Sequence, residues 1–147
     1  MIHEITLSGL DCGGIRIRLE SVYRPPEGKF TGYEDCFGTI EIRTVYFRTA
    51  EDAPLWTSVN SLQRFCRELE ECHRTLSGTA GHETYENNLA LSVTMTKHGH
   101  AEVRGTYQPD MADDNILHFR FDTDQTMIAV AVRDLRKFLD SAMNDNI

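Results

Sequence analysis

The sequence predicts an α+β fold, in which a mostly antiparallel sheet of about six strands carries two amphipathic helices on one face. Three observations support this prediction: short segments where apolar and polar residues alternate, two longer segments where apolar residues recur at helical spacing, and short turns between most of the alternating segments. Short turns join antiparallel neighbours, because a parallel pair needs a long crossover. The predicted order is βββ-α-βββ-α.

The strands are predicted from alternation, which places apolar side chains on one face of a sheet. The clearest case is 15–20, where Ile and Leu alternate with Arg and Glu. In 39–48 the alternation changes phase at Val45, which indicates a β-bulge. The six predicted strands are 2–8, 15–20, 39–48, 89–95, 101–107 and 116–122.

The helices are predicted from apolar residues that recur with the period of an α-helix. Ser58 or Asn60 can cap the first helix, and Gly78 is expected to take the left-handed conformation that ends it. Asp124 is the expected cap of the second. Each helix has one apolar stripe, so both should cover the same side of the sheet. The predicted helices are 58–76 and 125–143.

The chain of 147 residues fits a single domain, 1–147, with no linker, internal repeat or low-complexity segment. Its hydrophobic content of 40% and charged content of 26% are globular values, so it is expected to fold. No apolar run approaches the ~18 residues that span a bilayer. The first residues lack the pattern of a signal peptide, which favours a cytoplasmic location without membrane association.

The sequence contains no recognisable catalytic, cofactor or metal signature, and it predicts a protein that is not an enzyme and has no cofactor. His98 and His100 flank a turn glycine, but a metal site needs at least a third ligand. The acidic loop 110–115 lacks the spacing of a calcium loop. Cys66 lies on the apolar stripe of a helix, where an inert thiol is expected.

The negative charge is concentrated in segments expected to be loops. The net charge is −8, which argues against binding a nucleic-acid backbone. Segments 49–57, 77–88 and 108–115 contain seven acids and no Lys or Arg. They either keep the protein soluble or form an acidic surface that binds a basic protein partner. The seven candidate partner-binding residues are Glu51, Asp52, Glu83, Glu86, Asp110, Asp113 and Asp114.

Five segments with characteristic order and spacing follow one another along the chain. They are Leu62-Gln-Arg-Phe65-Cys-Arg-Glu-Leu69, Leu76-Ser-Gly78-Thr-Ala80, Leu89-Ala-Leu91-Ser-Val93, Gly99-His-Ala-Glu-Val103-Arg-Gly105 and Phe119-Arg-Phe121-Asp-Thr-Asp124-Gln125. Together they resemble the WapI-type immunity proteins of bacteria. The resemblance covers about residues 39–140 and implies a non-enzymatic cytoplasmic protein that neutralises a cognate toxin domain, often a nuclease. Nuclease domains are typically basic, so an acidic inhibitor would match their charge.

The leading hypothesis from the sequence is therefore an immunity-like binding protein. Two alternatives stay open. One is a small-molecule-binding domain or enzyme with a pocket between sheet and helices. The other is an interaction domain that forms a homo-oligomer through a sheet edge or a helix face.

Overall fold

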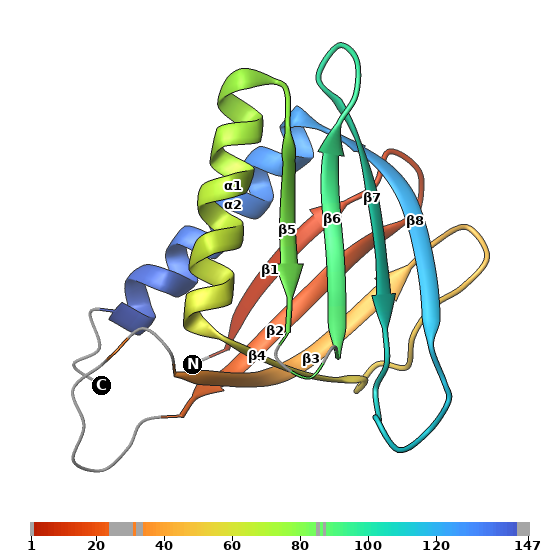
Figure 1. The fold of residues 1–147 in the computed structure, drawn as a ribbon, viewed down its shortest axis with the longest axis vertical. Helices are drawn as coiled ribbons and strands as arrows, with labels where there is room; N and C mark the ends of the chain where they lie inside the picture. Colours follow the sequence, from red (N-terminus) through yellow and green to blue (C-terminus); the bar gives the residue numbers. More distant parts are fainter. Residues whose placement is uncertain (1, 24–30, 32–33, 85, 87, 144–147) are drawn as a thin grey trace.

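The structure is a computed structural model that describes residues 2–23, 31, 34–84, 86 and 88–143 (Figure 1). The described chain contains eight strands and two α-helices. The first half contains β1 (His3–Ser8), β2 (Gly14–Val22), β3 (Asp35–Arg43), β4 (Pro54–Ser58) and α1 (Val59–Thr75). The second half contains β5 (Thr79–Glu83), β6 (Leu89–Met95), β7 (His100–Tyr107), β8 (Leu117–Asp124) and α2 (Gln125–Met143).

The strands form two four-stranded antiparallel sheets, with the orders β1-β2-β3-β4 and β5-β6-β7-β8. The predicted α+β class is confirmed, but the prediction of a single sheet of about six strands was wrong. The missed strands are β4 and β5, within segments expected to be loops. β4 begins with Pro54, which fits the first residue of an edge strand because no ladder hydrogen bond is lost there. In β5, the inward positions hold Ala80 and His82, so its apolar alternation is weak.

The predicted strand 39–48 ends early, at Arg43. The chain turns at Thr44–Phe47, where the Thr44 N–H donates to the Phe47 carbonyl at 2.8 Å. The phase change at Val45 therefore marks a hairpin tip, and the predicted bulge there was wrong. The register shift of this sheet lies instead in β2, between Leu19 and Ser21.

The two halves repeat the same ββββα order, although the sequence shows no repeat. A buried threonine is the last residue but one in the fourth strand of each half, Thr57 in β4 and Thr123 in β8. The next residue caps the helix: Ser58 Oγ accepts from the Ser61 N–H at 3.2 Å, and Asp124 Oδ1 accepts from the Met127 N–H at 3.0 Å. The two halves thus share the same strand-to-helix junction, in which a buried threonine is followed by the residue that caps the helix.

The buried threonines also connect the two halves. Thr57 Oγ1 lies 3.2 Å from Nε2 of His82 in β5, and Thr123 Oγ1 donates to the Ser8 carbonyl of β1 at 2.7 Å. Each fourth strand is therefore tied to the first strand of the other half. The helices follow the same exchange, since α1 packs against β5 and α2 against β1.

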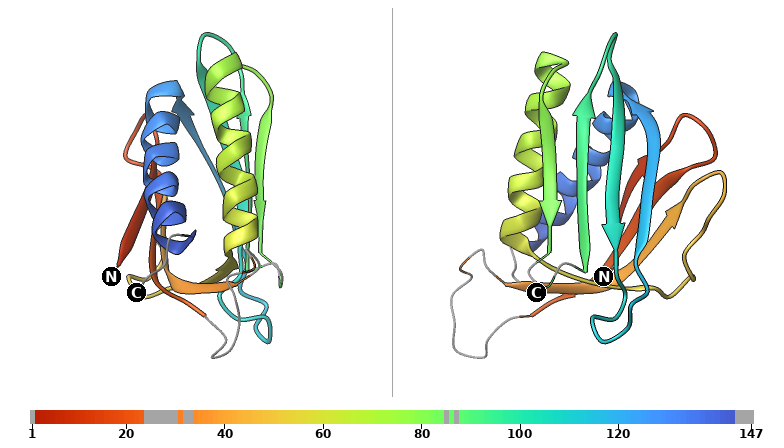
Figure 2. Two further views of the ribbon diagram at one scale, coloured as in Figure 1. Left: turned by 90° about the vertical axis from the view of Figure 1, so that its left-hand side faces the viewer. Right: turned by 45° about the vertical axis from the view of Figure 1, so that its right-hand side comes forward.

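The two helices lie side by side, with α1 packed on β5 and α2 packed on β1 (Figure 2). α1 begins after Ser58, as one of the two predicted caps requires. Its end differs from the prediction, because Leu76 (φ 56°) takes the left-handed conformation at the C-cap. One continuous core contains inward side chains of both sheets and the apolar stripes of both helices.

Gly38 in β3 faces the register shift of β2, and a Cβ atom there would lie 1.8 Å from the Arg18 carbonyl oxygen. We expect Gly38→Ala to lower the free energy of unfolding by roughly 2–4 kcal/mol, because the backbones must separate. Gly81→Ala in β5 is the matched control, since the nearest heavy atom lies 4.0 Å from its Cβ position. Chemical denaturation checks both variants. Equal stability of the two would contradict this account of the close approach.

Candidate functional site

The seven candidate acids are all exposed: six lie on three connections, and Glu83 is the last residue of β5 instead of a loop residue. Glu51 and Asp52 precede β4, and Glu86 lies between β5 and β6. Asp110, Asp113 and Asp114 occupy the β7–β8 connection. The β7–β8 connection, the end of β5 and the chain entering β4 lie at the lower end of the molecule in Figure 1, whereas the first part of the β3–β4 connection projects to the right. The fold therefore brings together acids that are distant in sequence.

A buried asparagine in the β5–β6 connection links the β7–β8 connection to β4, the strand that follows Glu51 and Asp52. Asn88, with no exposed surface, accepts a hydrogen bond from the Trp56 N–H at 3.2 Å through its side-chain oxygen. Its side-chain nitrogen donates to the Gln108 carbonyl at 2.8 Å, and the Gln108 N–H donates to the Asn88 carbonyl at 2.9 Å. Because Trp56 belongs to β4 of the first sheet, Asn88 also joins the two sheets. We call the end held by Asn88, with its seven acids, the acidic end.

Two exposed apolar side chains lie among the acids of the β7–β8 connection. Met111 is 48% exposed and Ile116 is 50% exposed. The backbone between them is ordered by Asp110, whose Oδ1 accepts from the Ala112 N–H at 2.9 Å. Arg48 lies in the same connection as Glu51 and Asp52, just beyond the cation-free segment. The acidic end thus combines carboxylates with a few exposed apolar groups.

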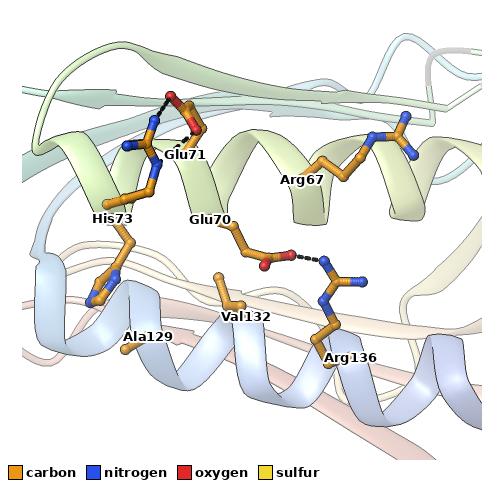
Figure 3. Close-up of a pocket in the computed structure, with 8 residues that line it drawn as sticks. Arg67, Glu70, Glu71, His73, Ala129, Val132 and Arg136 are labelled. Atoms are coloured by element: carbon orange, nitrogen blue, oxygen red, sulfur yellow. Dashed lines mark hydrogen bonds and ion pairs between the residues drawn. The ribbon is translucent and has the colours of Figure 1, made fainter.

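A groove of about 560 Å³ lies between α1 and α2, and its lining is mostly charged (Figure 3). Glu70 of α1 points across the groove and forms an ion pair with Arg136 of α2. Glu71 and Arg74 pair on α1 itself. Four of the charged groups that line the groove therefore pair with each other, and Arg67 and His73 complete its polar lining.

The thiols of the described chain are unsuited to nucleophilic chemistry where they are buried. Burial raises the pKa of Cys66 to about 11, with the nearby Glu70 acting in the same direction. A thiol with such a pKa is protonated at neutral pH and is a poor nucleophile. Burial also raises the pKa of Cys72. None of the four cysteines forms a disulfide, and Cys36 is buried in β3 whereas Cys12 is exposed.

His82 is buried in β5, whereas the sequence placed it in a loop. Its ring centroid lies 5.6 Å from that of Phe65, and burial lowers its pKa to about 4. His98 and His100 are exposed at the β6–β7 turn, where His98 has a φ of 57°. In the described residues, no three His, Cys, Asp or Glu side chains are grouped closely enough to hold a metal ion.

Sequence reasoning found the acids but missed the residue that gathers them. Asn88 follows an acidic segment and resembles an ordinary loop residue, so only its zero exposure reveals its role. The hairpin tip Val45–Phe47 was also missed as a surface feature, because apolar residues next to a strand resemble its continuation.

The sequence matches the family described as the Immunity protein WapI-like family over residues 6–142. The chain belongs to the WapI-like immunity protein family. The match confirms the resemblance seen over 39–140 and extends it to the β1–β2 hairpin. No curated protein shows a significant match to this chain. Neither α1 nor α2 of this WapI-like protein is long and apolar enough to cross a membrane.

Asn88→Ala in the WapI-like chain should destabilise the fold by about 2–3 kcal/mol, because it leaves the Trp56 N–H and the Gln108 carbonyl without buried partners. Thermal unfolding measures the loss. Asn115→Ala, at an exposed position of the β7–β8 connection, is the matched control. If both substitutions have the same small effect, Asn88 does not hold the connections together.

The stability of this WapI-like protein should fall in mild acid because of His82. Its pKa is 6.5 when unfolded and about 4 when folded, so the unfolded chain takes up the proton first. Stability is unaffected above pH 6.5 and declines as the pH falls towards 4, by up to about 3 kcal/mol. His82→Gln should flatten this part of the profile, and His118→Gln, at an exposed position, should keep it. Unfolding midpoints from pH 7.5 to 4.5 test this, and identical slopes for all three proteins would contradict it.

Proposed function

We propose that this chain is an immunity protein that neutralises a cognate toxin domain by binding a basic surface of the toxin through its acidic end. The observation that carries the proposal is the buried Asn88, which joins the acid-bearing β5–β6 and β7–β8 connections to β4, the strand that Glu51 and Asp52 precede. Family membership supports binding of a toxin as protein partner. From the acidic end we infer which surface of this chain makes the contact, and that the toxin surface it contacts is basic.

Charge is the main physical reason for this choice of surface. Seven exposed carboxylates at one end produce a negative field that attracts a cationic surface and speeds encounter. The outer faces elsewhere are balanced, as in the cluster where Arg120 lies 2.9 Å from both Glu102 and Asp122. Balanced faces exert little long-range attraction, so the acidic end dominates the approach of a basic partner.

The acidic end also offers the apolar contacts that a stable complex needs. Interfaces bury an apolar centre within a polar rim. Met111 lies between Asp110 and Asp113 and Ile116 follows Asp114, so exposed apolar side chains are available beside the carboxylates of this connection. We place the protein in the cytoplasm, where it would meet an incoming toxin, and we assign it no catalytic step. Inhibition then requires only that the basic surface of the toxin be covered.

Neutralising two acids of this end should weaken toxin binding. We expect Asp113→Asn with Asp114→Asn to weaken the complex about tenfold at low salt, mostly through slower association, and to reduce its salt dependence. The probe is the purified cognate toxin domain, sought first among the genes that neighbour this chain's gene. Surface plasmon resonance at 50 mM and 500 mM NaCl measures both rates.

The matched control is Glu71→Gln with Asp140→Asn, which removes the same charge from α1 and α2, the two elements that carry none of the seven acids. The control should bind as the wild type does, apart from a small effect of net charge. An equal loss in both double variants would show that only total charge matters. Tight, salt-independent binding by all three proteins would contradict the proposed surface.

A further inference from the structure

We infer that the free edge of β8, together with the hairpin tip opposite it, binds an extended segment of the toxin partner by adding a strand to the second sheet. This inference rests on the proposed function and names a second part of the contact. The extended segment is expected to carry apolar side chains flanked by Lys or Arg.

β8 is an edge strand with backbone groups available for pairing. It pairs with β7 on one side only. On its other side, the Asp122 carbonyl accepts from the Leu10 N–H at 2.8 Å, which shows that the backbone groups of Asp122 point to the free edge. Groups alternate along a strand, so those of Arg120 and His118 point the same way. In the described chain no further backbone hydrogen bond reaches this edge.

The hairpin tip, Val45–Phe47, presents three consecutive exposed apolar side chains. Val45 is 59% exposed, Tyr46 84% and Phe47 61%. The tip is a built turn: Thr44 Oγ1 accepts from the N–H groups of Tyr46 and Phe47, at 3.2 and 3.1 Å. Aromatic side chains on an ordered turn can bury large areas in a partner at little entropic loss.

The tip and the strand edge enclose one hollow. Residues of the tip and five consecutive residues of β8 line a space of about 290 Å³, with Asp11 from the β1–β2 turn. A short extended segment there would bond to the β8 backbone and place alternate side chains against the tip, as in other cases of strand addition.

The charges at the two ends of β8 indicate the occupant. Asp11 and Asp122 lie at one end of the hollow, and Asp113 and Asp114 lie in the connection that leads into the other end of β8. Arg120, in the middle, is ion-paired with Glu102 and Asp122. Arg43 and Arg48 form the base of the tip, and Arg43 pairs with Glu41. Acids at both ends favour a segment with cationic side chains beside its apolar ones.

The test removes one backbone donor and compares it with a variant that keeps it. Arg120→Pro lacks the N–H that faces the free edge, and edge strands tolerate proline when this group faces outward. Arg120→Ala is the reference, because it loses the same side chain and keeps the N–H. The probe is the same cognate toxin domain. Relative to Arg120→Ala, we expect Arg120→Pro to raise the dissociation constant about tenfold.

Thermal unfolding establishes that both variants are folded. If Arg120→Pro unfolds, His118→Pro is compared with His118→Ala in the same way. Equal binding by the proline and alanine variants, with wild-type binding intact, would overturn strand addition and leave the proposed function standing. Absence of wild-type binding would overturn the proposed function, and the inference with it.

The tip provides a second readout. Tyr46→Ser with Phe47→Ser should weaken binding at least tenfold without lowering the unfolding temperature, because both side chains are exposed in the free protein. Ile2→Ser is the control, an apolar residue 54% exposed that lies away from the tip, and it should bind as the wild type does. If the tip variant binds with unchanged affinity, the hairpin tip does not contact the bound segment, and that part of the inference is wrong.

Discussion

The buried amide of Asn88 is the interaction on which the acidic end depends. A buried amide must have its donors and acceptors satisfied, because an unpaired polar group away from water is costly. Asn88 meets this requirement only when β4, the β5–β6 connection and the β7–β8 connection are all in place. Its hydrogen bonds therefore fix the β5–β6 and β7–β8 connections next to β4, although the carboxylates near them repel one another. The stability of the fold offsets this repulsion.

Contacts between each half and the first strand of the other half hold the two halves together. Thr57 bonds across to β5 and Thr123 to β1, while each helix packs on the first strand of the opposite half. Neither half can bury its helix stripe without the other, since the core is continuous through both. This mutual dependence makes the acidic end and the β8 edge parts of one rigid arrangement, so a partner can contact both at once.

The sequence predicted the elements with strong periodicity and missed those held by tertiary contacts. The helix boundaries and the strands around 89–107 follow from apolar spacing and caps, which are local properties. β4 and β5 are short, and Pro54 and His82 interrupt their patterns, so long-range pairing decides their state. For the site, the acids were visible in the sequence, but their convergence was not, because it depends on Asn88 and on the path of two sheets.

We propose that a toxin covers the acidic end. Hydrogen exchange, measured on the chain alone and on the chain bound to the cognate toxin domain, is the test. We expect binding to slow exchange in the connections 49–53 and 108–116, and in β8. Protection confined to the groove between the helices, around 67–74 and 129–136, with no change at the acidic end, would contradict it.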